Sequence, residues 1–189
     1  LNVAGVDLLV AIKLTQTLGM AVAGLALWAW LRDRLPGAGP LFGAIAYILA
    51  PFHLVNVYVR GDSLSEFYAF VFFPLILLGI ERVSIQARGR DVTLLAFSVA
   101  GLIVTHNVSA MLFAPFCALY ALMAMAAPQL LALPGATGSR RVGRELGGLL
   151  LAVGSGLALS AWFWIPALAE ASGAQLGDQS TGFFSFANH

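Results

Sequence analysis

The sequence predicts an all-α fold, a polytopic transmembrane bundle of about six spans. Of the 189 residues, 60% are hydrophobic and only 10% are charged, whereas soluble domains carry about 25% charged residues. The mean hydropathy is +0.88, and long apolar runs recur along the whole chain. A soluble chain of this size could not bury so much apolar surface, but lipid can cover it.

A helix that crosses the hydrocarbon core needs roughly 20 apolar residues. Six segments of one transmembrane domain, 1–189, are predicted to cross: 8–31, 41–59, 64–80, 92–105, 108–131 and 146–168. The fourth is short. The run 92–127 is too long for one span and has polar residues near its middle, so we expect a tight helical hairpin turning at Thr105, His106 and Asn107.

The basic residues predict the orientation of the chain. Eight of the ten fall in loops that six helices would place on one side: Arg32, Arg34, Arg82, Arg88, Arg90, Arg140, Arg141 and Arg144. Short loops rich in Lys and Arg stay cytoplasmic. Both ends of the chain should therefore be extracytoplasmic. Lys13 and Arg60 are the exceptions.

Several features bound the class of protein further. The sequence starts at Leu1 rather than Met and stops at His189 in an aromatic, polar stretch, so we expect a fragment of a larger membrane protein. The net charge of +1 gives no indication of nucleic-acid binding. Cys117 is the single cysteine and reads as a small buried hydrophobe. Gly148, Ala152, Gly156 and Ser160 recur every four residues, which favours close approach of another helix.

Polar residues gather on the predicted extracytoplasmic side: Asp7, His53, Asn56, Arg60, Asp62, Glu66, His106, Asn107, Glu170 and Asp178. A pore or proton relay more often places its charges near the middle of the membrane. This distribution therefore predicts binding or chemistry at the outer interface.

Arg60 is the first candidate, because the planar guanidinium group matches phosphate oxygens. The alternatives are a contact with a lipid headgroup or an ion pair with Asp62. Asp62 and Glu66 share a helix face and could act as an acid–base pair or hold a divalent ion. Alternatively, Ser63 and Glu66 form a capping box at a helix start. Lys13 either extends to the interface or reaches an outer carboxylate or phosphate.

His53, His106 and Asn107 complete the candidate binding residues. His53 follows Pro51, where a helix break is expected. Two histidines and the acidic pair lack metal-ligand spacing, so no metal site is predicted, although a divalent ion as cofactor stays open. The sequence has no P-loop, dinucleotide fingerprint, nucleophile elbow or HExxH motif, which argues against the common ATP-driven and zinc-hydrolase classes.

Five short motifs carry a resemblance to a known family. They are AYILAP at 46–51, YVRGDSLSE at 58–66, FP at 73–74, THN at 105–107 and WIPALAE at 164–170. Together they resemble large bacterial membrane proteins described as "6-pyruvoyl-tetrahydropterin synthase related", which in turn resemble GT-C glycosyltransferases. The chain has no zinc-binding histidine triad, so the resemblance implies no pterin chemistry.

The resemblance implies a GT-C-like glycosyltransferase of the bacterial cytoplasmic (inner) membrane, which takes a sugar from a polyprenyl-phosphate carrier at the extracytoplasmic face. A carboxylate in an early outer loop is the base in such enzymes, and that loop would lie upstream of this sequence. The catalytic residue is therefore unassigned, with Asp62 and Glu66 as candidates. Membrane lipid and a polyprenyl-phosphate sugar are the expected partners. The alternatives are a transporter or flippase of a lipid-linked or anionic solute, and a non-catalytic membrane scaffold.

Overall fold

The computed structural model describes residues 5, 7–55, 64–130 and 139–170. These residues form helices joined by short turns, with no strand among them. In chain order the helices are α1 (Leu8–Leu31), α2 (Gly39–Ile48), α3 (Pro51–Val55), α4 (Leu64–Gln86), α5 (Gly89–Thr105), α6 (Asn107–Leu130), α7 (Ser139–Leu159) and α8 (Ala161–Ala169). The all-α prediction is therefore confirmed for the described part of the chain.

Four helical segments are long and apolar enough to cross a membrane: Leu8–Leu31, Leu64–Gln86, Asn107–Ala126 and Val142–Leu159. Gly39–Val55 is a shorter apolar segment. Large apolar side chains stay uncovered on the outside of the bundle, as at Leu112 (67% exposed), Phe116 (67%) and Trp162 (70%). Each would lose about 1.5–3 kcal/mol of burial free energy if left in water. Lipid can cover these exposed apolar side chains, so the surface indicates a membrane protein.

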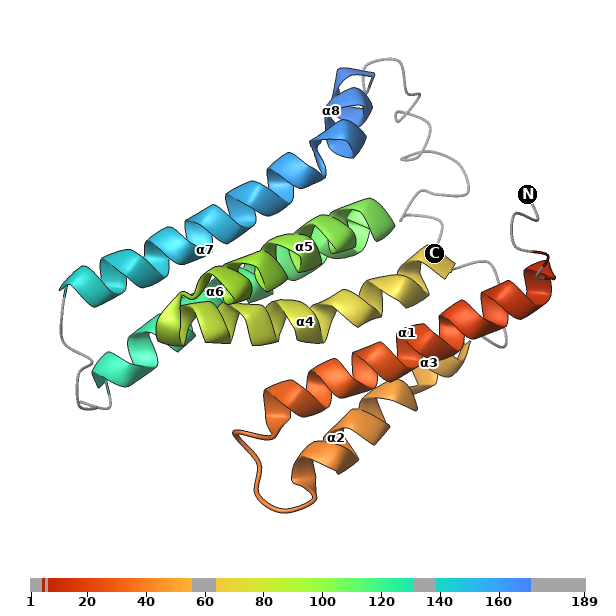
Figure 1. The fold of residues 1–189 in the computed structure, drawn as a ribbon, viewed down its shortest axis with the longest axis horizontal. Helices are drawn as coiled ribbons and strands as arrows, with labels where there is room; N and C mark the ends of the chain where they lie inside the picture. The colour runs from red at the N-terminus through yellow and green to blue at the C-terminus, as the bar shows by residue number, and fades with distance from the viewer. Residues whose placement is uncertain (1–4, 6, 56–63, 131–138, 171–189) are drawn as a thin grey trace, which may run out of the picture.

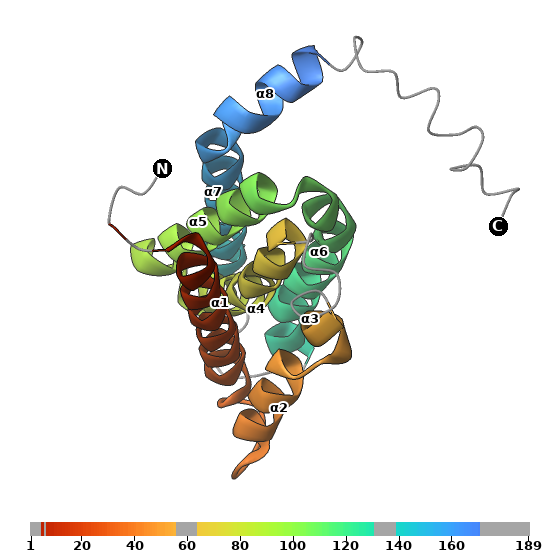
Figure 2. The same ribbon diagram turned by 90° about the vertical axis from the view of Figure 1, so that its right-hand side faces the viewer.

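Helix α4 lies at the centre of the bundle (Figures 1 and 2). It packs against α1 on one side and against α5, α6 and α7 on the other, while α2 packs against α1. The buried core lies between α4, α5 and α7: Ala69, Ile76, Ile80, Val83, Leu95, Leu102, Leu149 and Ala152. Side chains of α6, among them Phe113 and Tyr120, pack against this core while remaining partly exposed.

Two of the predicted spans are not continuous helices. Segment 41–59 is divided into α2, which ends at Ile48, and α3, which begins at Pro51. Proline has no backbone N–H to donate into the preceding turn, so a new helix begins there. Segment 146–168 is divided at Ser160, whose hydroxyl donates to the carbonyl oxygens of Gly156 (2.9 Å) and Leu157 (3.2 Å). Such back-bonding bends helices.

The other helix limits follow the sequence more closely. Helix α1 has the predicted bounds, and the predicted hairpin is confirmed, since α5 ends at Thr105 and α6 begins at Asn107. His106 between them has extended backbone angles (φ −155°, ψ 94°). Helix α4 continues to Gln86 rather than ending near Ile80, because polar residues can extend a helix past the end of its apolar run.

The small-residue stripe predicted on α7 faces its neighbours. Ala152 and Ser160 are fully buried, and Gly156 lies against Val99 and Ala96 of α5. Gly148 lies against Val83 of α4. The absence of side-chain bulk lets α7 approach the core closely, as the spacing predicted.

Candidate functional site

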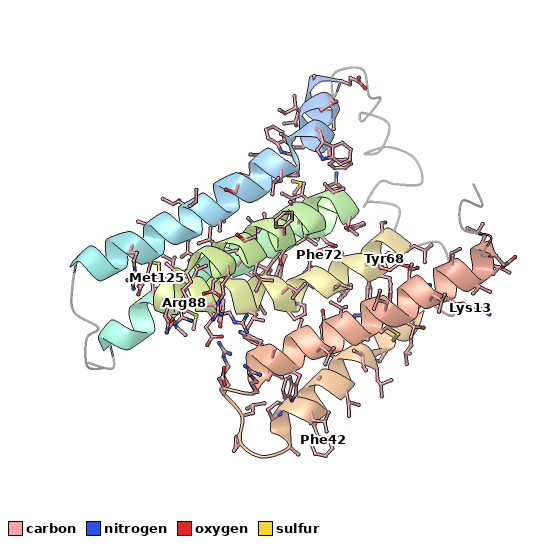
Figure 3. The ribbon with its side chains drawn as sticks, viewed as in Figure 1. Lys13, Phe42, Tyr68, Phe72, Arg88 and Met125 are labelled. Atoms are coloured by element: carbon pink, nitrogen blue, oxygen red, sulfur yellow. The ribbon has the colours of Figure 1, made fainter. Side chains whose placement is uncertain are left out.

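Several of the predicted site residues lie at one end of the bundle. Thr15 of α1 and Tyr68 of α4 share a hydrogen bond of 2.6 Å between their hydroxyl groups, which fixes the first halves of these helices side by side. Thr105, at the end of α5, lines the same cavity as both of them. Lys13 and Tyr68 are labelled at this end in Figure 3, with Arg88 at the other. We call this the polar end.

His53 of α3 is buried, with 4% of its surface exposed. Its ring packs edge-on against Phe70 (4.5 Å between ring centroids), Tyr47 (5.0 Å) and Phe67 (6.3 Å). Neither ring nitrogen has a hydrogen-bond partner in the described structure. Contacts of an N–H with an aromatic face compensate only weakly. An unmade hydrogen bond of a buried polar group costs about 1–3 kcal/mol, so this imidazole requires an explanation.

His106 and Asn107 form the start of α6. The backbone N–H of Ser109 donates to Nδ1 of His106 (3.2 Å), and the Ser109 hydroxyl lies 2.7 Å from the same nitrogen. Asn107 Oδ1 accepts from the Val108 N–H at 2.9 Å. Both side chains therefore satisfy free amides of a helix start. Because Nδ1 accepts, the neutral His106 ring carries its hydrogen on Nε2, which remains a donor.

Lys13 and Glu66 occupy the polar end in different ways. Lys13 is exposed on the second turn of α1. Glu66 is half-buried in the first turn of α4 and is engaged by a further interaction. Asp7 caps α1, since its Oδ1 accepts from the Leu9 N–H (2.9 Å) and the Val10 N–H (3.4 Å). Asp7 therefore has a structural role.

Two separate cavities lie at the polar end. One of about 390 Å³ is lined by Thr15, Tyr68 and Thr105 together with apolar side chains of α1 and α4. The other, of about 10 Å³, lies beside His53 and Phe67 and is roughly the size needed for one water molecule. Lys13 projects from α1 about 200° away from Thr15, so it does not face the larger cavity.

Arg60 and Asp62 lie outside the described residues. Within the described part of the chain, no three His, Cys, Asp or Glu side chains are close enough to hold a metal ion.

The opposite end contains a polar cluster that the sequence did not predict. Arg34 forms an ion pair with Glu81, donates to the Trp30 carbonyl oxygen and donates to Tyr120 Oη at 2.8 Å. Its guanidinium carbon also lies 4.5 Å from the centre of the Trp30 ring. Trp30 Nε1 donates to the same Tyr120 oxygen at 3.0 Å. These contacts join α1, α4 and α6. The one local signal in the sequence is that Arg34, in the turn after α1, follows Trp30 by four residues.

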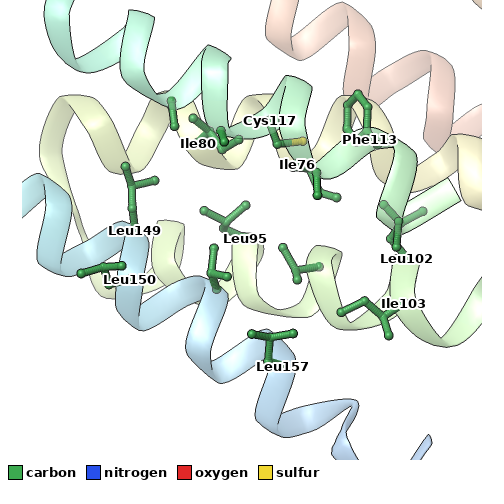
Figure 4. Close-up of a pocket in the computed structure, with 16 residues that line it drawn as sticks. Ile76, Ile80, Leu95, Leu102, Ile103, Phe113, Cys117, Leu149, Leu150 and Leu157 are labelled. Atoms are coloured by element: carbon green, nitrogen blue, oxygen red, sulfur yellow. The ribbon is translucent and has the colours of Figure 1, made fainter. Parts of the chain in front are cut away.

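An apolar cleft separates α6 from α7 above α4 and α5 (Figure 4). It has a volume of about 350 Å³ and is lined by aliphatic side chains together with Phe113 and Cys117. Cys117 is partly exposed toward this cleft rather than fully buried. Cys117 is the one ionisable side chain among the lining residues and the rest are apolar, so the cleft suits a hydrocarbon chain.

The fold and these surfaces define a helical membrane protein with a polar end, a polar cluster at the opposite end and an apolar cleft between α6 and α7. Comparison of the chain with models of protein families, with curated proteins and with solved structures found no match. The resemblance to the pterin-synthase-related membrane proteins therefore rests on the five sequence motifs alone.

Proposed function

We propose that this chain belongs to a GT-C-like membrane glycosyltransferase of the bacterial inner membrane. Its substrate would be a polyprenyl-phosphate sugar, bound at the polar end, which faces the extracytoplasmic side. The single observation that carries this proposal is the buried imidazole of His53 at that end, whose ring nitrogens have no hydrogen-bond partner among the described residues. A buried polar group without a partner calls for an explanation, such as a catalytic role or a bound ion or water molecule. The motif resemblance supplies the reaction class.

The cleft between α6 and α7 supports a lipid-linked substrate. Its apolar lining matches the hydrocarbon part of such a molecule, while the phosphate would bind at the polar end. Arg60 is proposed for the phosphate group, with Lys13, which is exposed at the same end but does not face the larger cavity, in support. His53, His106 through Nε2, and Asn107 are proposed for polar groups of the sugar or phosphate.

The proposed reaction is direct transfer. The acceptor hydroxyl oxygen forms a bond to the anomeric carbon, and the bond from that carbon to the phosphate oxygen breaks. The polyprenyl phosphate leaves with the bonding electron pair, stabilised by the cationic groups. A carboxylate takes the hydroxyl proton. Glu66, or Asp62, would perform this role if the base lies within this sequence.

The experiment measures donor binding and donor turnover separately. The full chain in nanodiscs is titrated with a radiolabelled polyprenyl-phosphate hexose, using wild type, Arg60→Ala and Arg60→Lys. Charge-assisted contacts contribute about 1.5–3 kcal/mol, so Arg60→Ala should weaken binding by roughly 10- to 150-fold. Lysine should recover only part of the loss, because it lacks the planar fork. Arg144→Ala is the matched control and should bind normally.

Turnover is followed as release of polyprenyl phosphate. Glu66→Gln should bind the donor normally and lose turnover if Glu66 is the base. Binding of the donor by well-folded Arg60→Ala with wild-type affinity would contradict the phosphate role. The glycosyltransferase proposal would fail if wild type neither binds nor consumes the donor.

A transporter or flippase is the second candidate, because two predicted spans are discontinuous. Helices α2 and α3 are divided before Pro51, and α7 and α8 are divided at Ser160. Discontinuous helices form the substrate sites of many transporters. In proteoliposomes, a flippase would move the intact lipid-linked sugar between leaflets without releasing polyprenyl phosphate, whereas the proposed enzyme releases it.

A further inference from the structure

Four arginines surround an open cavity at the end of the bundle opposite the polar end. It has a volume of about 520 Å³, and its charged lining residues are Arg32, Asp33, Arg82, Arg88, Arg90 and Asp91. They come from the end of α1, the end of α4 and the start of α5. We call this the arginine cavity. Figure 3 labels Arg88 at this end, far from Lys13.

The guanidinium groups of this cavity are incompletely paired. Arg32 Nε lies 3.9 Å from Asp33 Oδ1, and Arg90 Nε lies 3.7 Å from Asp91 Oδ1. Both distances exceed a normal hydrogen bond, so donors remain available. Arg82 is half-buried and has no ion pair with any described residue. Four cations against two carboxylates leave an excess of positive charge.

The start of α5 adds to this field. Arg88 is the N-cap residue of α5 and its side chain makes no capping hydrogen bond, while Asp91 lies in the first turn. The N-terminal end of a helix carries partial positive charge that favours anions. The arginines and the helix start therefore act in the same direction, and an anionic group is the complementary ligand.

The position of the cavity along α4 fits the level of a lipid headgroup. Arg82 lies eighteen residues after Leu64 on α4, roughly 27 Å along the helix axis. The hydrocarbon core is about 30 Å thick, so Arg82 lies near its boundary. Ile85 and Leu94 line the same cavity, and Ile85 is 50% exposed. A phospholipid could place its phosphate among the arginines and its acyl chains along these apolar side chains.

We propose that the arginine cavity binds the headgroup of an anionic phospholipid at the face opposite the polar end. Basic pockets between membrane helices are suited to such headgroups. This site is independent of the proposed glycosyltransferase reaction, because it lies at the other end of α4.

The test counts bound lipids on the full chain by native mass spectrometry. Protein is taken from nanodiscs that contain phosphatidylcholine and phosphatidylglycerol together. Wild type should retain phosphatidylglycerol preferentially. Arg82→Gln should weaken that binding about five-fold, the effect of one arginine at a membrane surface, and Arg82→Gln with Arg88→Gln roughly 25-fold if the two add. Arg82→Lys, which keeps the charge, should keep the preference.

Arg144→Gln is the matched control, since Arg144 is exposed on α7 and does not line the cavity. It should bind phosphatidylglycerol as wild type does. Equal retention of both lipids by wild type would overturn the proposal. So would an equal loss in Arg144→Gln and Arg82→Gln, which would indicate general surface charge. Displacement of the lipid by inorganic phosphate would also overturn it, because a soluble anion would then be the ligand.

Discussion

The packing of α7 on α5 can be tested with two glycines of the same helix. A Cβ atom at Gly156 would lie 2.9 Å from Val99 Cβ and 3.0 Å from the Ala96 carbonyl oxygen. Both of those atoms are fixed by the backbone of α5, so Gly156→Ala must separate the helices. A Cβ atom at Gly154 would meet nothing within 4 Å. Overpacking of this kind costs about 1–3 kcal/mol.

Alanine also favours a helix over glycine by about 1 kcal/mol, and this gain is common to both variants. The difference between Gly156→Ala and Gly154→Ala therefore isolates the contact with α5. We expect Gly156→Ala to be less stable than Gly154→Ala by about 1–3 kcal/mol. The free energy of unfolding can be measured by circular dichroism in mixed detergent micelles titrated with dodecyl sulfate. Equal stabilities, or a less stable Gly154→Ala, would refute this packing.

Two further substitutions test the ends of the bundle. Tyr120→Phe removes the oxygen that accepts from Trp30 and Arg34, so the free energy of unfolding should fall by about 1–2 kcal/mol; an unchanged value in the same titration would show that this cluster does not join α1 to α6. His53→Phe removes two ring nitrogens that have no partner among the described residues from an aromatic environment, so the free energy of unfolding should stay equal or rise by about 1 kcal/mol while donor binding weakens. A large loss of stability in His53→Phe would show that the imidazole is structural.

Hydropathy predicted the long helices well because one effect, the transfer of apolar side chains from water into lipid, largely determines where they lie. The bounds of α1 matched, and the turn at His106 was visible as a polar interruption of an apolar run. The end of α4 was placed too early, since Glu81 and Arg82 ended the apolar run without ending the helix. The break before Pro51 had a local signal. The break at Ser160 had no local signal in the sequence. A serine at this position fits the stripe of small residues equally well, so it did not indicate a helix end.

The candidate site was predicted less completely than the helices. The order of the apolar segments predicted that His53, Glu66 and His106 lie on the same side of the membrane. It could not reveal that the rings of Tyr47 and Phe70 enclose His53. It also could not show that His106 caps α6. These properties depend on tertiary contacts and on backbone angles at a single residue. The ion pair between Arg34 and Glu81 joins residues far apart in the sequence, so no local sequence pattern indicates it.

Accessibility of introduced cysteines tests the central claim most directly, namely that the bundle crosses a membrane with its polar end outside. In a Cys117→Ala background, single cysteines would replace Ala38, exposed before α2, and Glu170, exposed after α8. A membrane-impermeant thiol reagent added to intact cells should label the cysteine at position 170 and spare the one at position 38 until the membrane is opened. Labelling of both positions in intact cells, or of position 38 alone, would contradict the account.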